Sequence, residues 1–425
     1  MINMVKLSEV SDLTVGYVGP MGKEYVENGT LFLRSLNIKP FSFDLTDVKY
    51  ITEDFNETIS KSILHYNDVV IVRTGIPGIA AVVPKEFDGC NCSDLVIVHP
   101  DTSKINPYYL CAFINSWGRL QVKNAKVGAI QKHFNVTEAK EMLIPLPDME
   151  EQNLIANILR DINGKINLNN KIHSKLDSLL HSIYDYWFLQ FEFPNEEGKP
   201  YKSSGGKMVW NDELKREIPE GWKVGRIGEL CEIARGVSYT AANLKSGGTP
   251  ILSLASIDRK GGYIPEGIKY YSGKYNESKV LKPYDAIMCN TDMTQEKEIV
   301  AKVVLVPDIF GGRPILSTHH ISHLIFDDEV YKGYICLTTQ TKWFHNSIKG
   351  FSSGTNVLGL DSDGFKNFKL LIPTNDVLIK FNEIVMNNEK YKSNLIKENQ
   401  ELASLRDFLL PMLMNGQVTF KGDDE

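Results

Sequence analysis

Short runs of cysteine and histidine are the first candidates for chemistry in this 425-residue chain. Cys90 and Cys92 stand one residue apart, and His319, His320 and His323 lie within five residues of one another. A structural zinc site normally needs a wider cysteine spacing and a second pair of ligands. The chain has no second cysteine pair, and no carboxylate stands at ligand spacing from the histidines. We therefore expect no metal site, and we interpret the histidines as recognition or edge-strand residues.

Two further segments carry fragments of enzyme motifs. INPYYL (105–110) contains half of the Asn-Pro-Pro-aromatic loop with which amino-methyltransferases hold a flipped base, but the second proline is missing. Pro107 fits better as the first residue of a helix, a position that favours proline. VGYVGPMGKE is not a phosphate-binding loop, because Glu24 follows Lys23 and the glycine spacing is wrong. No catalytic triad order, nucleophile elbow, helicase motif or nuclease core is evident, so we predict no active site.

Length, composition and charge limit the class of protein. A chain of 425 residues exceeds one compact core, so we expect at least two domains. Its 42% hydrophobic and 24% charged residues are typical of globular protein, and no apolar run is long enough to span a membrane. Scattered cysteines and the lack of a signal-peptide core predict a cytoplasmic location. A net charge of −6 argues against a stand-alone nucleic-acid binder, although a partner chain can supply phosphate contacts.

The two halves of the chain repeat the same segments in the same order. KLSEVSDLTVGY parallels RIGELCEIARGVSY, GTLFLRSLNI parallels GTPILSLASI, and YNDVVIVRTG parallels PYDAIMCNTD. In each half there follow a polar loop with a glycine, a strand ending in Ile-Pro, and a long helix. The repeat predicts two tandem domains of mixed helix and strand, an α/β (α+β) class. The alternative is two unrelated domains with similar generic strand patterns.

The two long helices have a coiled-coil pattern. From Ile155 to Trp187, and from Phe381 to Met412, apolar residues recur at steps of three and four. This heptad spacing is typical of a two-helix coiled coil. A helix of about 40 residues is roughly 60 Å long, too long to bury its apolar stripe against one small domain. We therefore expect the two helices to pack together, and to be antiparallel if the domains are related by pseudo-twofold symmetry.

Polar residues interrupt both apolar stripes near their middle. In an antiparallel register Asn169 and His173 would lie near Glu398. One buried polar contact in an apolar seam can fix the register at some cost in stability. We predict this role for the three residues, with a partly exposed His173 as the alternative.

Four segments of the chain resemble one known family. They are IPLPDMEEQNLIANIL, the aromatic YDYWFLQFEFP, the linker GKPYKSSGGKMVWNDELKREIPEGWKV and the terminal LLPMLMNGQV. Together they resemble the specificity (S) subunit of type I restriction–modification enzymes, and IPEGW within the linker is the most specific motif. The second junction departs from the pattern, because the residues LIK (378–380) stand where the first has EEQ (150–152).

The resemblance implies a division of the chain into two target-recognition domains and two spacer helices. We place the first domain at 1–147, the first helix at 148–192, a linker at 193–217, the second domain at 218–373, the second helix at 374–416 and a tail at 417–425.

The resemblance also implies a function. Each domain would read one half of a split, asymmetric site in double-stranded DNA, and the helices would set the spacing and dock two methyltransferase (M) subunits. Those partners would bind S-adenosylmethionine and methylate a flipped adenine, and restriction/translocase (R) subunits can join them. The chain itself would be non-catalytic, with no cofactor and no membrane contact.

Polar loops at equivalent places in the two domains are the candidate DNA-binding sites, because Arg, Lys, Asn and Gln read base edges well. Each residue could instead be a solvated surface or turn residue. In the first domain the candidates are Arg73, Thr74, Lys123, Asn124, Lys126, Gln131, Lys132 and His133. In the second domain they are Asn290, Thr291, Gln295, Lys297, Lys349, Ser352, Ser353, Thr355 and Asn356.

Two other classes of protein remain as alternatives. One is a coiled-coil interaction scaffold without a DNA role. The other is a fused DNA methyltransferase or nuclease, which S-adenosylmethionine binding by the purified chain would reveal.

Overall fold

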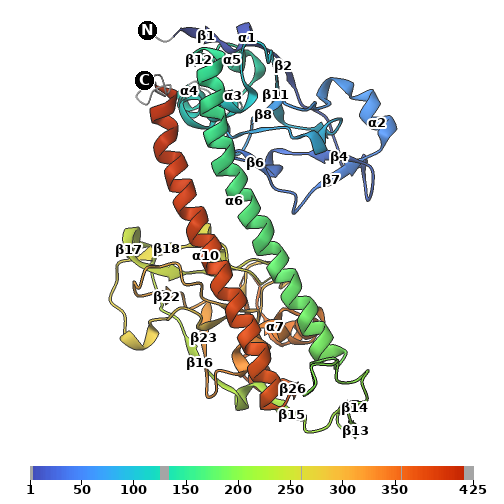
Figure 1. Ribbon diagram of the computed structural model, residues 1–425. Helices are drawn as coiled ribbons and strands as arrows, with labels where there is room; N and C mark the ends of the chain where they lie inside the picture. Colours follow the sequence, from blue (N-terminus) through green and yellow to red (C-terminus); the bar gives the residue numbers. More distant parts are fainter. Residues whose placement is uncertain (1–2, 125–133, 260, 356, 416–425) are drawn as a thin grey trace, which may run out of the picture. The chain divides into compact units, whose positions relative to one another are not determined.

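The computed structural model describes residues 3–124, 134–259, 261–355 and 357–415 (Figure 1). Its contacts form two compact units. Unit 1 comprises Met1–Asn169 and Glu398–Glu425, and unit 2 comprises Asn170–Lys397. The long helices α6 (Met149–Tyr184) and α10 (Asn375–Met414) each contribute one part to each unit. No described helix is long and apolar enough to cross a membrane.

A four-stranded antiparallel sheet forms the centre of unit 1. Its order is β2 (Ser11–Val15), β11 (Leu95–Pro100), β8 (Val69–Val72) and β9 (Ala80–Val82). The β-branched runs VVIV and LVIV favour strands, and their side chains alternate between two buried clusters. Val69 and Ile71 face the cluster that includes α3 (Pro107–Phe113), whereas Val70 and Val72 face the opposite one. Both faces of the sheet are therefore covered.

Shorter elements of unit 1 surround this sheet. A second sheet has the order β10-β4-β7-β3, in which β10 is parallel to β4, and β1 pairs with β12 and β5 with β6. These elements are β1 (Met4–Lys6), α1 (Leu7–Val10), β3 (Tyr25–Val26), β4 (Thr30–Leu33), β5 (Ile38–Lys39), β6 (Ser42–Phe43), β7 (Lys49–Ile51), α2 (Glu53–Thr58), β10 (Asn91–Cys92), α4 (Arg119–Asn124), α5 (Val136–Lys140) and β12 (Leu143–Pro145).

Unit 2 repeats this plan. Its central sheet has the order β16 (Cys231–Arg235), β23 (Ile321–Phe326), β19 (Ala286–Cys289) and β21 (Val303–Leu305). Its other sheets have the orders β18-β17-β22, β15-β26, β20-β25-β24 and β13-β14. The remaining elements are β13 (Met208–Asn211), β14 (Arg216–Pro219), β15 (Lys223–Arg226), β17 (Leu244–Leu252), β18 (Lys269–Tyr271), β20 (Thr291–Asp292), β22 (Leu316–Ser317), α7 (Tyr331–Gln340), α8 (Lys342–Ile348), β24 (Ser352–Ser353), β25 (Leu358–Leu360), α9 (Ser362–Lys366) and β26 (Lys369–Ile372).

Local geometry also repeats between the units. Gly29 and Gly248 both have positive φ, and a Cβ at either would lie within about 2.5 Å of a carbonyl oxygen on the neighbouring strand. The Asp68 carboxylate accepts a hydrogen bond from the backbone N–H three residues earlier, at 2.7 Å, and Asp285 does the same at 2.8 Å. The prediction of two tandem α/β domains with a repeated fold is thus confirmed.

The strand registers correct the alignment of the two strand–helix junctions. Leu143 pairs with Lys6, and Lys369 pairs with the equivalent Arg226, so Leu143 corresponds to Lys369. The helix begins six residues later in both units, at Met149 and Asn375. Matching the two Ile-Pro pairs therefore displaces the alignment by two residues.

The corrected alignment changes which residues differ at the junction. Gln152 of EEQ now corresponds to Leu378, rather than to the third residue of LIK. Both are buried. The Gln152 side chain accepts a hydrogen bond from the Asn106 backbone and donates to the carbonyls of Lys104 and Pro147. One junction is therefore held by a buried amide, and the other by apolar packing.

The helices pack side by side and antiparallel within each unit (Figure 1). In unit 1, Arg406 donates to Asn163 at 3.1 Å, and Asn169 donates to Glu398 at 2.7 Å, so the numbering runs in opposite directions. In unit 2, Lys392 reaches Asp177 at 2.6 Å. The prediction of antiparallel paired helices is confirmed.

The seam of α10 differs from its predicted heptad. Tyr391 and Leu405 are exposed, whereas their neighbours Lys392 and Arg406 make contacts with α6. The apolar stems of Lys and Arg cover buried surface while their charged groups find partners, so apolar spacing alone misplaces the seam by one residue.

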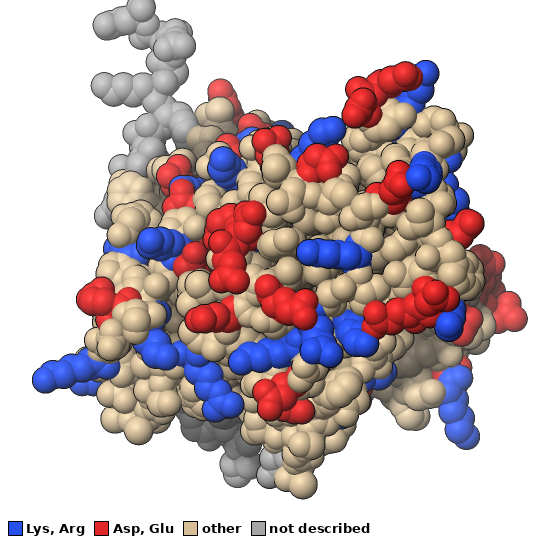
Figure 2. Space-filling view, turned by 90° about the horizontal axis from the view of Figure 1, so that it is seen from below, with Lys and Arg blue, Asp and Glu red and all other residues tan. Residues whose placement is uncertain are grey.

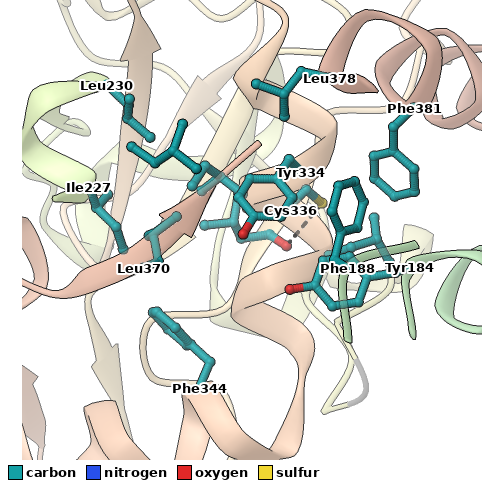
Figure 3. Packing of buried hydrophobic residues seen from close by; sticks show 14 of the residues in the cluster. Tyr184, Phe188, Ile227, Leu230, Tyr334, Cys336, Phe344, Leu370, Leu378 and Phe381 are labelled. Atoms are coloured by element: carbon teal, nitrogen blue, oxygen red, sulfur yellow. Dashed lines mark hydrogen bonds between the residues drawn. The ribbon is translucent and has the colours of Figure 1, made fainter. Parts of the chain in front are cut away.

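Aromatic residues at the end of α6 pack into the core of unit 2. The ring of Phe188 lies 4.7 Å from Phe381 and 4.8 Å from Tyr334, and Tyr184 lies beside them (Figure 3). The Tyr184 hydroxyl is 3.0 Å from Thr338 Oγ1. These rings fix the end of α6 to α7 and α10 of the same unit.

Candidate functional site

In unit 1 the two predicted loops meet at the end of β8. Arg73, the residue after this strand, donates from Nε to the carbonyl of Phe134 at 3.2 Å, and the Phe134 N–H donates to the Arg73 carbonyl at 3.2 Å. Phe134 follows the segment 125–133, so one end of the second loop is held against the first. Lys126, Gln131, Lys132 and His133 lie outside the described residues, as do the side chains of Lys123 and Asn124.

Thr74 belongs to a small hydrogen-bonded group that we call the unit 1 clasp: Ser35, Thr74 and Asp94. The Thr74 hydroxyl donates to Asp94 Oδ2 at 2.6 Å, and the Ser35 hydroxyl donates to the Asp94 carbonyl at 2.9 Å. Asp94 has φ 61°, a left-handed conformation that aspartate tolerates better than most residues. The clasp ties the loop after β8 to the start of β11.

In unit 2 the equivalent loops are joined by strand pairing. Thr291 and Asp292 form β20, which pairs with β25, and the Leu360 N–H donates to the Asn290 carbonyl at 2.8 Å. This bond corresponds to the one between Phe134 and Arg73 in unit 1. The structure therefore brings together, in each unit, two loops that are far apart in the chain: Arg73 and Phe134 in unit 1, and Asn290 and Leu360 in unit 2.

Side chains of the predicted residues strengthen the junction in unit 2. Gln295 Nε2 donates to the Thr355 carbonyl at 2.8 Å. Lys297 Nζ donates to the carbonyls of Lys349 and Ser352, at 3.0 and 2.8 Å. These hydrogen bonds hold the two loops together, so Gln295 and Lys297 have a structural role.

The remaining candidates of unit 2 are also placed at this junction. Lys349 Nζ donates to Asn346 Oδ1 at 3.0 Å, and Asn290 Nδ2 donates to the His319 carbonyl at 3.3 Å. Ser353 pairs with Gly359 between β24 and β25, and Asn356 lies outside the described residues.

A histidine takes the place of Asp94 in unit 2. The Thr291 hydroxyl lies 3.0 Å from His320 Nδ1, just as Thr74 contacts Asp94. Burial lowers the pKa of His320, and His319, whose ring centroid is 4.0 Å away, lowers it further. His323 points elsewhere, since its Nε2 lies 3.4 Å from Asp285. The three histidines therefore do not converge, and Thr291 with His320 forms the unit 2 clasp.

Exposed apolar residues mark the tips of both loops, and sequence reasoning missed them. Ile76 is 62% exposed and Met293 is 72% exposed. Each stands four residues after the last residue of its central strand, β8 or β19. The equivalent placement of a large apolar side chain in water is a signal that aligning the two loops could have revealed. Asp94 was also missed.

On the face shown in Figure 2, neither sign of charge gathers into one patch. In the view of Figure 2, Lys and Arg side chains are interspersed with Asp and Glu side chains. The net charge of −6 agrees with this mixture. Binding to a polyanion would therefore depend on local geometry, or on charges supplied by another chain.

The residues considered above for catalysis or metal binding lie in a helix cap or in the buried core. Pro107 is the first residue of α3, and the Asn106 side chain caps that helix by accepting from the Tyr108 N–H at 2.9 Å, which confirms the helical interpretation of INPYYL. Cys90 and Cys92 are buried free thiols, and burial raises the pKa of Cys90 to about 12. Among the described residues no group of three or more His, Cys, Asp or Glu side chains could hold a metal ion.

Comparison with known proteins shows which proteins this chain is similar to. Residues 5–178 match the type I restriction modification DNA specificity domain. The type I restriction enzyme MjaIX specificity subunit of Methanocaldococcus jannaschii is 25% identical over 332 residues, which cover 75% of this chain and 70% of that subunit. The HindI specificity subunit of Haemophilus influenzae is 21% identical, covering 90% and 92% of the two chains.

A solved structure supports the fold. The S subunit of a type I restriction–modification system from M. genitalium has a TM-score of 0.53 at 15% identity, covering 99% of this chain and 97% of that one. Over most of its length the chain is thus similar to specificity subunits of type I restriction–modification enzymes, and residues 5–178 match a type I restriction modification DNA specificity domain.

Proposed function

We propose that the chain recognises a split DNA site, with each unit reading one half through the paired loops after β8 or β19. The observation that carries this proposal is the equivalence of the two loop junctions. In each unit the first loop follows the third strand in the order of the central sheet, β8 or β19, and an equivalent backbone hydrogen bond joins it to the second loop. Two different sets of side chains on one repeated scaffold suit two different half-sites.

The exposed tips give each unit an apolar contact with DNA. Ile76 and Met293 are large enough to pack on the methyl group of thymine in the major groove, and the polar residues beside them can bond to base edges or phosphates. The acidic net charge is consistent with partner subunits that supply phosphate contacts.

The helices serve as a spacer and as a docking surface for methyltransferase subunits. Their outer faces carry exposed large apolar residues in both units: Leu154, Leu168, Leu405 and Phe408 in unit 1, and Leu179, Ile379 and Tyr391 in unit 2. Such residues on a helix whose opposite face is already packed favour a partner of this kind.

In this proposal the chain has no active site of its own. The methyltransferase partners bind S-adenosylmethionine and methylate an adenine, and restriction subunits can join the complex. Equilibrium dialysis of the purified chain with labelled S-adenosylmethionine should therefore detect no binding, whereas the co-purified complex should bind it. Gel shifts with and without the methyltransferase subunit would separate this function from that of a scaffold without a DNA role.

Matched loop variants test the assignment of one half-site to each unit. The chain is co-expressed with its methyltransferase subunit, and modified bases are mapped by sequencing. We expect the wild type to methylate adenines in a split motif. Ile76→Ser should relax or weaken recognition of one half-site only, and Met293→Ser should affect only the other, each by about tenfold, because one good base contact contributes about 1–3 kcal/mol. Both residues are exposed, so folding should be unaffected.

Two results would contradict the proposal. Methylation at an uninterrupted palindrome would argue against two different half-sites. Identical effects of both variants on both halves would argue against one unit per half-site.

A further inference from the structure

The residue that each clasp threonine contacts differs between the units, although it stands at the same place beside the same pair of strands. Asp94 and His320 both stand just before the strand that pairs with β8 or β19, and both contact the threonine that follows that strand by two residues. The same threonine contact with a different side chain is what a specificity position on a repeated scaffold requires.

Only one of the two carboxylate oxygens of Asp94 takes part in the unit 1 clasp. Thr74 donates to Oδ2 at 2.6 Å, and in the part of the chain that the structure describes no hydrogen bond to Oδ1 is found. The side chain is half-buried, and its backbone is fixed at φ 61° with its carbonyl bound by Ser35. The carboxylate is thus held rigidly beside the loop whose tip is the exposed Ile76.

A fixed, acceptor-only carboxylate has a narrow choice of DNA partners. It repels phosphate, whereas in the major groove it accepts a hydrogen bond from the exocyclic amine of cytosine, the usual partner of Asp and Glu. A carboxylate that only tied two loops together could point both oxygens into the protein.

We propose that Asp94 is a specificity-determining residue that reads a cytosine in the half-site of unit 1. The inference rests on the proposed function, and it adds the chemical identity of one base and the residue that selects it. His320 occupies the same position in unit 2. Its Nδ1 contacts Thr291, so its Nε2 is the ring atom directed at a different base.

Asp94→Asn tests the inference, because asparagine tolerates the same backbone conformation and keeps one oxygen. In the co-expressed complex we expect the wild-type half-site to contain one defined cytosine, and the variant to lose about tenfold or more of its preference for that cytosine. The loss should fall in the same half-site that Ile76→Ser affects, with the other half unchanged.

Two control variants separate base reading from a structural role. Asp101→Asn makes the same change at the opposite end of β11, about 20 Å away along the strand, and should leave the motif unchanged. Thr74→Val removes the clasp hydrogen bond but keeps the carboxylate. It should lower the extent of methylation while cytosine stays preferred.

The outcomes are distinguishable. If the wild type shows a split motif and Asp94→Asn methylates the same motif with the same base preference, the inference is overturned and the proposed function stands. If Asp94→Asn and Thr74→Val both only lower methylation at an unchanged motif, Asp94 is structural and the inference is again overturned. If the wild type shows no split motif, the proposed function itself fails.

Discussion

Two Asp–His pairs, one in each unit, illustrate how a carboxylate partner and burial have opposite effects on the pKa of a histidine. In unit 1, His99 Nδ1 lies 2.7 Å from Asp68 Oδ1, and this hydrogen bond raises the pKa of His99 despite partial burial. In unit 2, His323 lies farther from Asp285, at 3.4 Å, and burial lowers its pKa. The first pair favours the charged imidazole, and the second favours the neutral one.

His99→Gln should therefore destabilise the protein in a pH-dependent way. Because the pKa of His99 is raised on folding, its stabilising contribution is complete below the unfolded value of about 6.5 and is lost as pH rises through the folded pKa. We expect the variant to lose roughly 1.5–3 kcal/mol at pH 5.5, typical of a hydrogen bond to a charged group, and clearly less at pH 9. Urea unfolding at both pH values measures the difference.

His65→Gln is the matched control, because the exposed His65 side chain lies 3.7 Å from Asp88 and should contribute little at either pH. An equal penalty for His99→Gln at both pH values would show that the charged pair does not stabilise the fold.

Polar contacts interrupt the helix seam within each unit. In unit 1 the buried Asn169 donates to Glu398 at 2.7 Å and to Asn399 at 2.9 Å, while its Oδ1 has no hydrogen-bond partner among the described residues. In unit 2, His173 Nδ1 lies 3.3 Å from Asp177, one turn along its own helix. The register role of Asn169, His173 and Glu398 stays a prediction, with Asn169 and Glu398 in direct contact.

The sequence could predict the helices but not the full composition of their seam. The apolar steps from Ile155 place α6 correctly because most of the marked residues are apolar. In α10 the seam includes Lys392, which a hydrophobic pattern excludes, and omits Tyr391, which it includes. Which face of such a helix is buried depends on the charges of its neighbour, and those are not visible in a local pattern.

Lys392 is the clearest test of an ionic contact in this seam. Its Nζ lies 2.6 Å from Asp177 and 2.7 Å from Glu389. Burial alone would lower the pKa of Lys392, but the nearby carboxylates of Glu389 and Asp177 raise it above its usual value. Burial alone would raise the pKa of Asp177, but His173 and Lys392 lower it to about 2. Lys392→Met should cost roughly 2–4 kcal/mol of unfolding free energy, because it leaves the partly buried carboxylate of Glu389 unpaired and leaves Asp177 with His173 alone.

Two control variants test whether unpaired charge causes the loss of stability in Lys392→Met. Lys397→Met removes a half-exposed pair with Asp308, at 3.1 Å, and should cost at most about 1 kcal/mol. Replacing Asp177 and Glu389 by leucine together with Lys392→Met should recover most of the stability. If the triple variant is no more stable than the single one, unpaired charge is not the cause.

At the scale of the molecule, the repeat was visible in the sequence, but the candidate site was visible only in part. Runs such as VVIV identify buried strands by themselves, because β-branched side chains favour sheets. The clasp joins Ser35, Thr74 and Asp94, and only the pairing of β8 with β11 brings Thr74 and Asp94 together. A loop residue whose role depends on such a contact has no local signature.

The proposed spacer predicts how the DNA site should change when the helices change length. Removing residues 166–172 from α6 and 396–402 from α10 deletes one heptad from each helix and removes Asn169 together with Glu398 and Asn399. The exposed Lys165 loses its ion pair with Glu398, which should contribute little. Seven residues correspond to about 10 Å of helix, or roughly 3 base pairs of DNA. The variant, co-expressed with the methyltransferase subunit, should methylate the same two half-sites with a gap shorter by about 3 base pairs.

A deletion in α6 alone puts the seam out of register and should abolish methylation. An unchanged gap in the double deletion would show that the helices do not set the spacing.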